Sequence, residues 1–257
     1  MKVGQKVEIL IHVTDVHGCP LKKMMELMKF RKTNPKDVSA RIGSLVHKYI
    51  ELRVGGETRR KSANRAFAIY NGELTSQDKV KAQKLLKSAE KWLYENIFKW
   101  DRRDVEVEAT REMAVNVGRE LIFGGRRVRF IITGTPDMVL YDDNQIIDFK
   151  TGKFRRKSHA LQVGAYSHLV WPDRQKVSPK PTARIVHLGD NTERFIRSDD
   201  LLRYMREWKT ELNDYILNLA DMLETVNTTG EIPEIRKTGY CHFCEYRMWC
   251  WGDVTEK

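Results

Sequence analysis

Residues 134–150 read GTPDMVLYDDNQIIDFK and hold two short apolar runs joined by an Asp-Asp-Asn turn. We expect this turn to fold the two runs together as a pair of strands. Side chains two residues apart on a strand point to the same face, so Asp148 and Lys150 share a face and Phe149 points into the core. Asp137 lies one short hairpin upstream, where it can reach the same edge of the sheet.

Two carboxylates that meet at a sheet edge form a hard-oxygen site suited to Mg²⁺ or Mn²⁺. A lysine beside them can orient an attacking water or stabilise charge on a phosphate. The alternative is a surface hairpin with an ordinary Asp–Lys pair. Asp148 lies among Ile146, Ile147 and Phe149, and a carboxylate in so apolar a strand favours the functional interpretation.

Further candidates flank this stretch. Gln162 and Tyr166 are one turn apart on the next expected helix, and they can present one face to a nucleic-acid strand or simply pack and face solvent. His47 can complete the metal shell from another helix, or it can be structural. Glu106 and Glu108 alternate on an expected strand, where one can face the metal or both can face solvent.

The surrounding pattern predicts an α/β protein with a mixed sheet flanked by helices. Helices are expected over residues 15–30, 38–54, 76–100, 158–170 and 199–226, with Ser76 as an N-cap. Strands are expected over 1–13, in a meander over 105–149 with a turn at Gly124-Gly125, and over 182–188, while 55–72 is expected to be a loop. We expect a single domain, 1–257, with a mostly helical N-terminal region (1–104), a core (105–197), and a C-terminal helix and cysteine region (198–257) that shares Cys19.

The balance of charged residues indicates what kind of partner the protein binds. The chain has 257 residues, and 46 basic against 35 acidic side chains give a net charge of +11, which favours a polyanionic partner. The basic residues form three clusters, which are either solvated faces or contacts to a nucleic-acid backbone: Arg59, Arg60, Lys61 and Arg65; Arg126, Arg127 and Arg129; Lys150, Lys153, Arg155, Arg156 and Lys157. No apolar run approaches the roughly 18 residues of a membrane span, and the N-terminus does not resemble a signal peptide, so we expect a cytoplasmic protein.

The cysteines predict a second metal site. Cys241, Cys244 and Cys250 have the spacing C-x2-C-x5-C, and Cys19 precedes Pro20 near the other end of the chain. Four thiolates can hold zinc or an iron–sulfur cluster, and the spacing does not choose between them. The alternative is four unrelated buried thiols.

Together these pieces resemble the RecB-like branch of the PD-(D/E)XK nucleases, and more closely the CRISPR-associated iron–sulfur cluster exonucleases of that branch. The matching pieces occur in family order: Cys19-Pro20, GSLVHKYIE with His47, GTPD with Asp137, DFK with Asp148 and Lys150, QVGAY with Gln162 and Tyr166, and the terminal C-x2-C-x5-C. The chain is longer than compact members, chiefly at 55–104 and 190–230.

The resemblance implies a restriction-endonuclease-like fold with an iron–sulfur-clamped C-terminus. It assigns the catalytic Mg²⁺ or Mn²⁺ to His47, Asp137, Asp148 and the Phe149 carbonyl, catalysis to Lys150, DNA contacts to Gln162 and Tyr166, and a [4Fe–4S] cluster to Cys19, Cys241, Cys244 and Cys250. It implies a metal-dependent exonuclease acting mainly on single-stranded DNA ends, which trims fragments for CRISPR spacer acquisition beside integrase proteins. The alternatives are a phage, viral or repair recombination nuclease, a non-catalytic iron–sulfur DNA-binding scaffold, and a zinc-stabilised interaction domain.

Overall fold

The computed structural model describes residues 6–29, 38–70, 72–152, 156–173, 176–232 and 246. The contacts divide the chain into two compact units, each made of several segments. The first unit comprises Met1–Pro35, Arg111–Gly134 and Arg206–Lys257, and the second comprises Lys36–Thr110 and Thr135–Met205. Within the described residues, six α-helices and two mixed sheets confirm the mixed α/β fold that the sequence predicts.

The first unit contains a four-stranded sheet. Its strands are β1 (Lys6–His12), β3 (Arg111–Val115), β4 (Ile122–Phe123) and β5 (Arg126–Gly134). β5 is central, because β1 pairs with it in parallel while β3 and β4 pair with it antiparallel. Gly124 and Gly125 take left-handed φ angles of 56° and 74° between β4 and β5, which confirms the expected turn.

The second unit contains a five-stranded sheet in the order β2-β6-β7-β8-β9. Its strands are β2 (Val105–Val107), β6 (Met138–Leu140), β7 (Gln145–Lys150), β8 (Thr182–His187) and β9 (Thr192–Ile196). β6 and β7 pair antiparallel across the expected turn, where Asn144 has a φ of 48°. β7 and β8 are parallel, and α5 (Arg156–Val170) supplies the crossover that a parallel pair requires.

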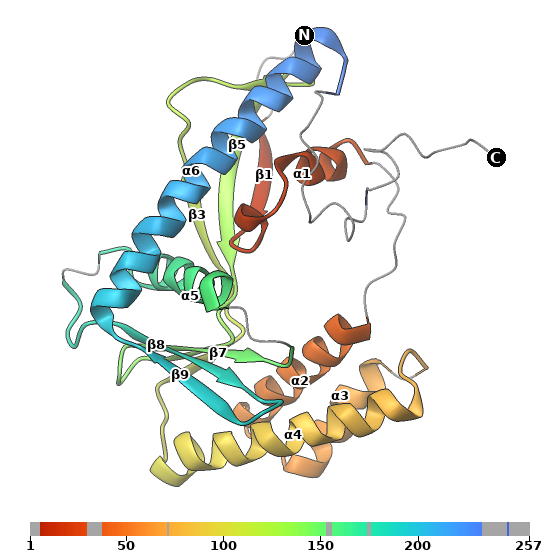
Figure 1. Cartoon of the computed structure of the whole chain (residues 1–257), viewed down its shortest axis with the longest axis vertical. Coiled ribbons are helices and arrows are strands. Elements are labelled where there is room, and N and C mark those ends of the chain that lie inside the picture. The colour runs from red at the N-terminus through yellow and green to blue at the C-terminus, as the bar shows by residue number, and fades with distance from the viewer. Residues whose placement is uncertain are drawn as a thin grey trace. The chain divides into compact units, whose positions relative to one another are not determined.

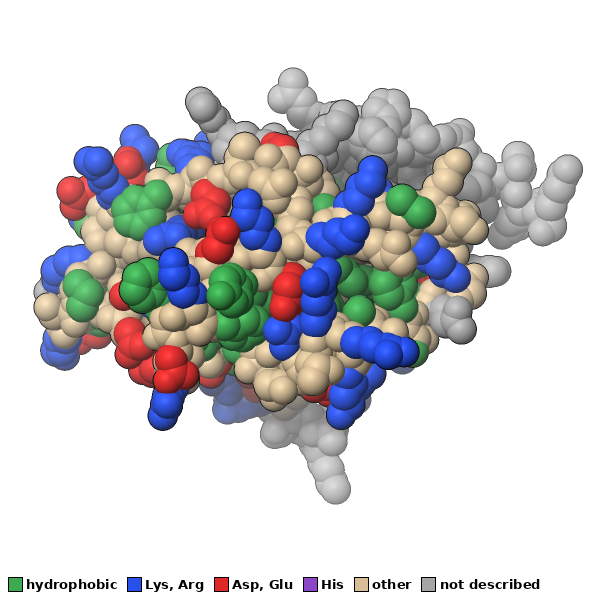
Figure 2. Space-filling model, turned by 90° about the horizontal axis from the view of Figure 1, so that it is seen from below, with side chains coloured by type: hydrophobic (Ala, Val, Ile, Leu, Met, Phe, Trp, Pro, Cys, Tyr) green, Lys and Arg blue, Asp and Glu red, His purple; other side chains and the backbone are tan. Residues whose placement is uncertain are grey.

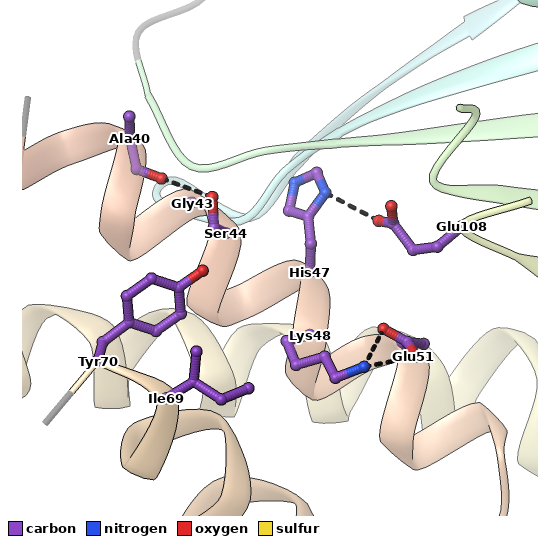
Figure 3. A pocket seen from close by; sticks show the side chains of 9 residues that line it. All are labelled: Ala40, Gly43, Ser44, His47, Lys48, Glu51, Ile69, Tyr70 and Glu108. Atoms are coloured by element: carbon purple, nitrogen blue, oxygen red, sulfur yellow. Dashed lines mark hydrogen bonds and ion pairs between the residues drawn. The ribbon is translucent and has the colours of Figure 1, made fainter. Parts of the chain in front are cut away.

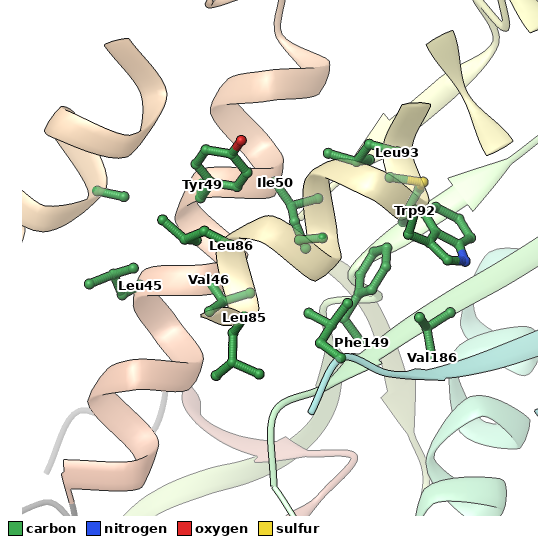
Figure 4. Close-up of a cluster of buried hydrophobic side chains, with 14 of the residues drawn as sticks. Leu45, Val46, Tyr49, Ile50, Leu85, Leu86, Trp92, Leu93, Phe149 and Val186 are labelled. Atoms are coloured by element: carbon green, nitrogen blue, oxygen red, sulfur yellow. The ribbon is translucent and has the colours of Figure 1, made fainter. Parts of the chain in front are cut away.

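A layer of helices covers one face of this second sheet: α2 (Val38–Val54), α3 (Arg59–Ile69) and α4 (Ser76–Asn96) (Figure 1). Figure 4 shows apolar side chains of α2 and α4 meeting Phe149 of β7 and Val186 of β8. Leu45, Leu93 and Phe149 are at most 1% exposed. Because each such side chain stabilises the fold by roughly 1.5–3 kcal/mol, the cluster holds α2 firmly against the sheet.

A polar network ties the same two helices together at the rim of the core. Glu90 of α4 accepts hydrogen bonds from the Tyr49 hydroxyl at 2.6 Å and from Arg53 of α2 at 2.8 Å. Burial alone would raise the pKa of Glu90, but these two donors outweigh it and hold the pKa below its ordinary value. Glu90 is therefore ionised at neutral pH, where its charge is matched by Arg53.

The sequence prediction of a loop over residues 55–72 is wrong, because Arg59–Ile69 forms α3. Arginine, lysine and alanine are good helix formers, so the segment needs few apolar residues to be helical. Ser62 and Ala66, four residues apart, are fully buried. Ala63, Phe67 and Tyr70 also pack against the core, so α3 has a short apolar stripe that its basic first turn obscures in the sequence.

The expected single meander over residues 105–149 is also wrong. β2 pairs with β6 in the second sheet, whereas β3 pairs with β5 in the first. Between β2 and β3, Glu108 takes a left-handed φ of 52°, which ends the strand alternation. The strand β9 was not anticipated from the sequence.

The remaining elements lie close to their expected positions. The expected helix over 15–30 divides into the short 3₁₀ helix η1 (Asp15–His17) and α1 (Pro20–Leu27), because Pro20 lacks an N–H and favours the first helical turn. The expected helix over 76–100 divides into α4 and η2 (Phe98–Trp100), and the N-cap of α4 is Thr75 rather than Ser76. α6 (Ser198–Thr229) begins in the second unit and continues into the first. No helix in the described part of the chain is both long and apolar enough to cross a bilayer.

Gly164 allows α5 to pack closely against the start of α6. A Cβ atom on Gly164 would lie 2.8 Å from the backbone nitrogen of Met205 and 2.9 Å from the carbonyl carbon of Tyr204. The contact is with backbone, which cannot rotate away as a side-chain end can. The glycine is therefore required by packing, and it fixes the helix that carries Gln162 and Tyr166.

We predict that Gly164→Ala destabilises the protein by about 1–3 kcal/mol through overpacking. In a helix where the added Cβ meets no obstacle, glycine to alanine would stabilise the protein by about 1 kcal/mol. The sign of the change in unfolding free energy therefore tells whether Gly164 is hindered. Gly189→Ala is the matched control, because a Cβ there meets nothing within 4 Å. Urea unfolding measures both variants, and a gain in stability for Gly164→Ala would contradict the packing described here.

Candidate active site

β7 presents Asp148 and Lys150 on one face, as its alternation predicts. Lys150 Nζ lies 2.9 Å from Asp148 Oδ1, and Asp148 is completely buried. Phe149 points the other way, where its ring meets that of Trp92 edge-on with centroids 5.0 Å apart. The two charged groups are thus paired in the apolar interior of the sheet.

Asp137 reaches the same place from the residue before β6. β6 is paired with β7 so that Met138 lies opposite Ile147. Asp137 Oδ2 accepts a hydrogen bond of 2.5 Å from the Phe149 backbone N–H. This bond fixes the Asp137 carboxylate beside the Asp148–Lys150 segment, as the hairpin prediction requires.

α2 brings His47 to Asp137. His47 Nδ1 lies 3.1 Å from Asp137 Oδ1 and 3.2 Å from Glu108 Oε1. A Cβ on Gly43, one turn earlier on α2, would lie 3.3 Å from Thr151 Oγ1, so the absence of a side chain lets the helix pass close to the end of β7. Donor atoms of His47, Glu108 and Asp137 all lie within 4.8 Å of one another, which is close enough to share one metal ion.

Glu108 is the member of this cluster that sequence reasoning left open. Strand alternation would place Glu106 and Glu108 on one face, but the left-handed φ at Glu108 separates them. Glu106 accepts a hydrogen bond of 2.6 Å from the Tyr141 hydroxyl, whereas Glu108 joins His47. No periodic pattern could have found this difference, because it depends on one backbone angle.

The carboxylates of this site are strongly perturbed. Burial raises the pKa of Asp148 to about 6; the Lys150 ammonium opposes that rise, and the Asp137 charge adds to it. Burial would raise the pKa of Asp137 too, but the His47 ring and the Phe149 N–H outweigh it and lower the pKa. Burial lowers the pKa of His47, but the carboxylates of Asp137 and Glu108 outweigh it and place the pKa well above 6.5.

The donor set fits a divalent cation. Asp148 Oδ2 is buried without a hydrogen-bond partner, although a buried carboxylate oxygen ordinarily has one. A cation beside Asp137 would satisfy that oxygen and relieve the repulsion between the two carboxylates. Oxygen donors with one imidazole suit Mg²⁺ or Mn²⁺. The Phe149 carbonyl belongs to the same segment, and its role as a ligand stays a prediction.

A chain of hydrogen bonds leads from Lys150 to α5. Lys150 Nζ donates to Gln162 Oε1 at 2.9 Å, and Gln162 Nε2 donates to the Tyr166 hydroxyl at 2.8 Å. Burial lowers the pKa of Lys150, but Asp148 and Asp137 outweigh it and raise the pKa above its ordinary value. Lys150 therefore stays protonated and donates hydrogen bonds to Asp148 and Gln162, so it does not act as a base. Tyr166 is 5% exposed, so its expected contact with DNA stays a prediction.

The cysteine prediction falls mostly outside the described residues. Cys19 is the N-cap residue of α1, with its side chain partly exposed. Cys241, Cys244 and Cys250 lie outside the residues that the structure describes. The second metal site accordingly stays a prediction.

Comparison with known proteins identifies the family of this chain. A solved structure titled "Crystal structure of SSO0001" aligns with 98% of this chain and 91% of that chain, at 17% identity and a TM-score of 0.42. No curated protein matches the chain. A family model described as the PD-(D/E)XK nuclease superfamily matches residues 12–251. Because that match spans nearly the whole chain and includes every residue of the site, the protein belongs to the PD-(D/E)XK nuclease superfamily.

Proposed function

We propose that the protein is a metal-dependent DNA exonuclease of the RecB-like branch that acts mainly on single-stranded ends. Superfamily membership implies metal-dependent phosphodiester hydrolysis. The observation that carries the proposal is the Asp148 carboxylate. Its Oδ2 is buried without a hydrogen-bond partner, while its Oδ1 lies 2.9 Å from the Lys150 ammonium. Donor atoms of His47, Glu108 and Asp137 lie within 4.8 Å of one another, and Asp137 is close enough for its charge to raise the pKa of Asp148.

Each residue has a distinct role in this proposal. His47, Glu108, Asp137 and Asp148 would hold the cation, which would lower the pKa of a water and polarise the phosphate. The Lys150 ammonium stabilises the negative charge that develops on the phosphate oxygens. Gln162 accepts a second hydrogen bond from Lys150 besides that to Asp148, so that the ammonium is aligned before substrate binds.

The surface charge supports a nucleic-acid substrate, although the three basic clusters contribute unequally. Arg127 pairs with Glu120, and Arg129 with Glu8, so the second cluster is largely neutralised. Lys153 and Arg155 of the third cluster lie outside the described residues. Figure 2 shows basic and acidic side chains interspersed on one face of the molecule rather than gathered in one patch.

The first cluster offers the more open cations. Arg59, Arg60 and Lys61 are exposed on the first turn of α3, whereas Arg65 pairs with Glu57. Exposed cations on one helical turn can follow a phosphate backbone and release its counterions. We therefore assign part of the DNA-binding track to α3, in place of the loop that the sequence suggested.

The first prediction from this proposal concerns the lysine. Lys150→Ala should lower the cleavage rate of end-labelled single-stranded DNA in Mn²⁺ by about 10²–10³-fold, as loss of one positioned charge typically does. Lys84→Ala removes an exposed lysine on α4 and should leave the rate unchanged. Circular single-stranded DNA should resist the wild type, because an exonuclease needs an end. Wild-type turnover by Lys150→Ala, with circular dichroism showing an intact fold, would reject the assignment.

The second prediction compares Glu106, which lies in β2, with Glu108, which directly follows β2. Glu108→Gln should raise the Mn²⁺ concentration needed for half-maximal cleavage, because it removes a charged donor from the cluster. Glu106→Gln is the matched control, since Glu106 bonds Tyr141 and lies outside the donor cluster. Chelation should abolish cleavage by both variants. Equal metal requirements for the two variants would show that Glu108 does not hold the cation.

The third prediction concerns the four cysteines, for which we propose a [4Fe–4S] cluster on the strength of the C-x2-C-x5-C spacing and the family resemblance. Protein purified without oxygen should be brown and contain about four irons per chain. Cys244→Ser should lose iron and stability, whereas Lys150→Ala should keep the iron. Zinc in place of iron would reject the cluster, and four fully reactive thiols in the folded protein would reject any metal.

The biological setting that we propose is the trimming of DNA fragments for CRISPR spacer acquisition, with integrase proteins as partners. It rests on the family resemblance of the motifs. An integrase encoded beside this chain would support it, whereas a neighbouring recombinase or polymerase would favour phage or repair recombination. The same active site serves either setting.

A further inference from the structure

A pocket of about 460 Å³ opens beside the donor cluster, between α2 and the end of α3 (Figure 3). Its lining residues all belong to the second unit: Ala40, Gly43, Ser44, His47, Lys48, Glu51, Ile69, Tyr70 and Glu108. Two of them, His47 and Glu108, are members of the donor cluster. The pocket therefore begins where the proposed function places the scissile phosphate.

The far side of the pocket is apolar. Figure 3 shows Ile69 and Tyr70 on the side remote from Glu108. Ile69 is 55% exposed, so its side chain offers apolar surface to the pocket that it lines. Tyr70 packs against the hydrophobic core and also lines the pocket, so its ring is supported from behind.

The charged groups of the lining are already balanced. Lys48 Nζ lies 2.6 and 2.7 Å from the two carboxylate oxygens of Glu51. The Ser44 hydroxyl donates to the Ala40 carbonyl at 3.0 Å. The lining thus offers no spare cation for a second phosphate. A flat and largely neutral group with one apolar face suits this pocket better.

We propose that this pocket, the nucleotide subsite, receives the unpaired base of the nucleotide next to the scissile phosphate, stacked on Tyr70. The inference rests on the proposed nuclease function and adds to it a binding site for a base, which gives a physical cause for the single-strand preference. A base can enter only when it is unstacked, so the subsite selects single strands. Every base has a π face, so stacking there tolerates any sequence.

The subsite is tested with a fluorescently labelled single-stranded oligodeoxynucleotide, by anisotropy in Ca²⁺ for binding and by cleavage in Mn²⁺ for kinetics. Ser44→Phe fills the pocket from an exposed position and should raise Kd and KM about tenfold, with kcat and the metal requirement little changed. Gln83→Phe, which adds the same side chain to an exposed position on α4 outside the pocket, is the control. Tyr70→Ala should weaken binding by about tenfold as well, and Tyr70→Phe should restore it.

Several outcomes separate the subsite from the hydrolytic function. Equal Kd values for Ser44→Phe and Gln83→Phe would overturn the subsite while leaving hydrolysis intact. If Tyr70→Ala fails to fold, the Ser44→Phe comparison decides alone, because Ser44 is exposed. The wild type could bind single-stranded DNA more tightly than Ser44→Phe does and yet cleave none. That result would support the subsite and reject the nuclease proposal. A strong sequence preference in binding would contradict stacking as the mode of recognition.

Discussion

The burial of the Asp148 carboxylate against the Lys150 ammonium is the constraint on which the site depends. Two charges removed from water in the middle of a sheet cost several kcal/mol each, and one ion pair repays this only with good geometry and further hydrogen bonds. Lys150 gains a second partner in Gln162, but one Asp148 oxygen has none. An apolar pair would satisfy folding better, so the arrangement indicates a site shaped for a cation and an anionic substrate.

The scaffold around that pair is built to hold it still. β7 lies between β6 and β8, and the helical layer behind it is fixed by a continuous apolar core. Glu90 ties α2 to α4, and Gly43 lets α2 approach the end of β7 closely enough for His47 to reach Asp137. On the other side, Gly164 lets α5 settle against α6 and keeps Gln162 in line with Lys150. Rigid elements thus carry His47, Asp148 and Lys150, while Asp137 and Glu108 lie directly beside strand ends, and the site is held in place before substrate binds, as preorganised catalysis requires.

Local features of this fold could be predicted from the sequence, and features that depend on one angle or on distant contacts could not. Strand alternation sufficed to place Asp148, Phe149 and Lys150, because the period of a strand is two residues. The motif resemblance singled out His47 and Gln162, which lie far from β7 in sequence. Glu108 could not be chosen over Glu106, since a single left-handed φ separates them. α3 was missed because its apolar stripe is short and lies behind a basic first turn, although Ala66 and Phe67 pack against the core.

The central claim is that Asp148 and Asp137 share a divalent cation with His47 and Glu108. Anomalous diffraction from crystals containing Mn²⁺ tests it most directly, because the scattering locates the metal without reference to activity. The account predicts one strong anomalous peak within coordination distance of Asp148 Oδ2 and of Asp137. His47 or Glu108 should complete the coordination shell of the metal, and Lys150 should still lie beside Asp148. Manganese bound elsewhere on the chain, with Asp148 Oδ2 still unpartnered, would contradict it.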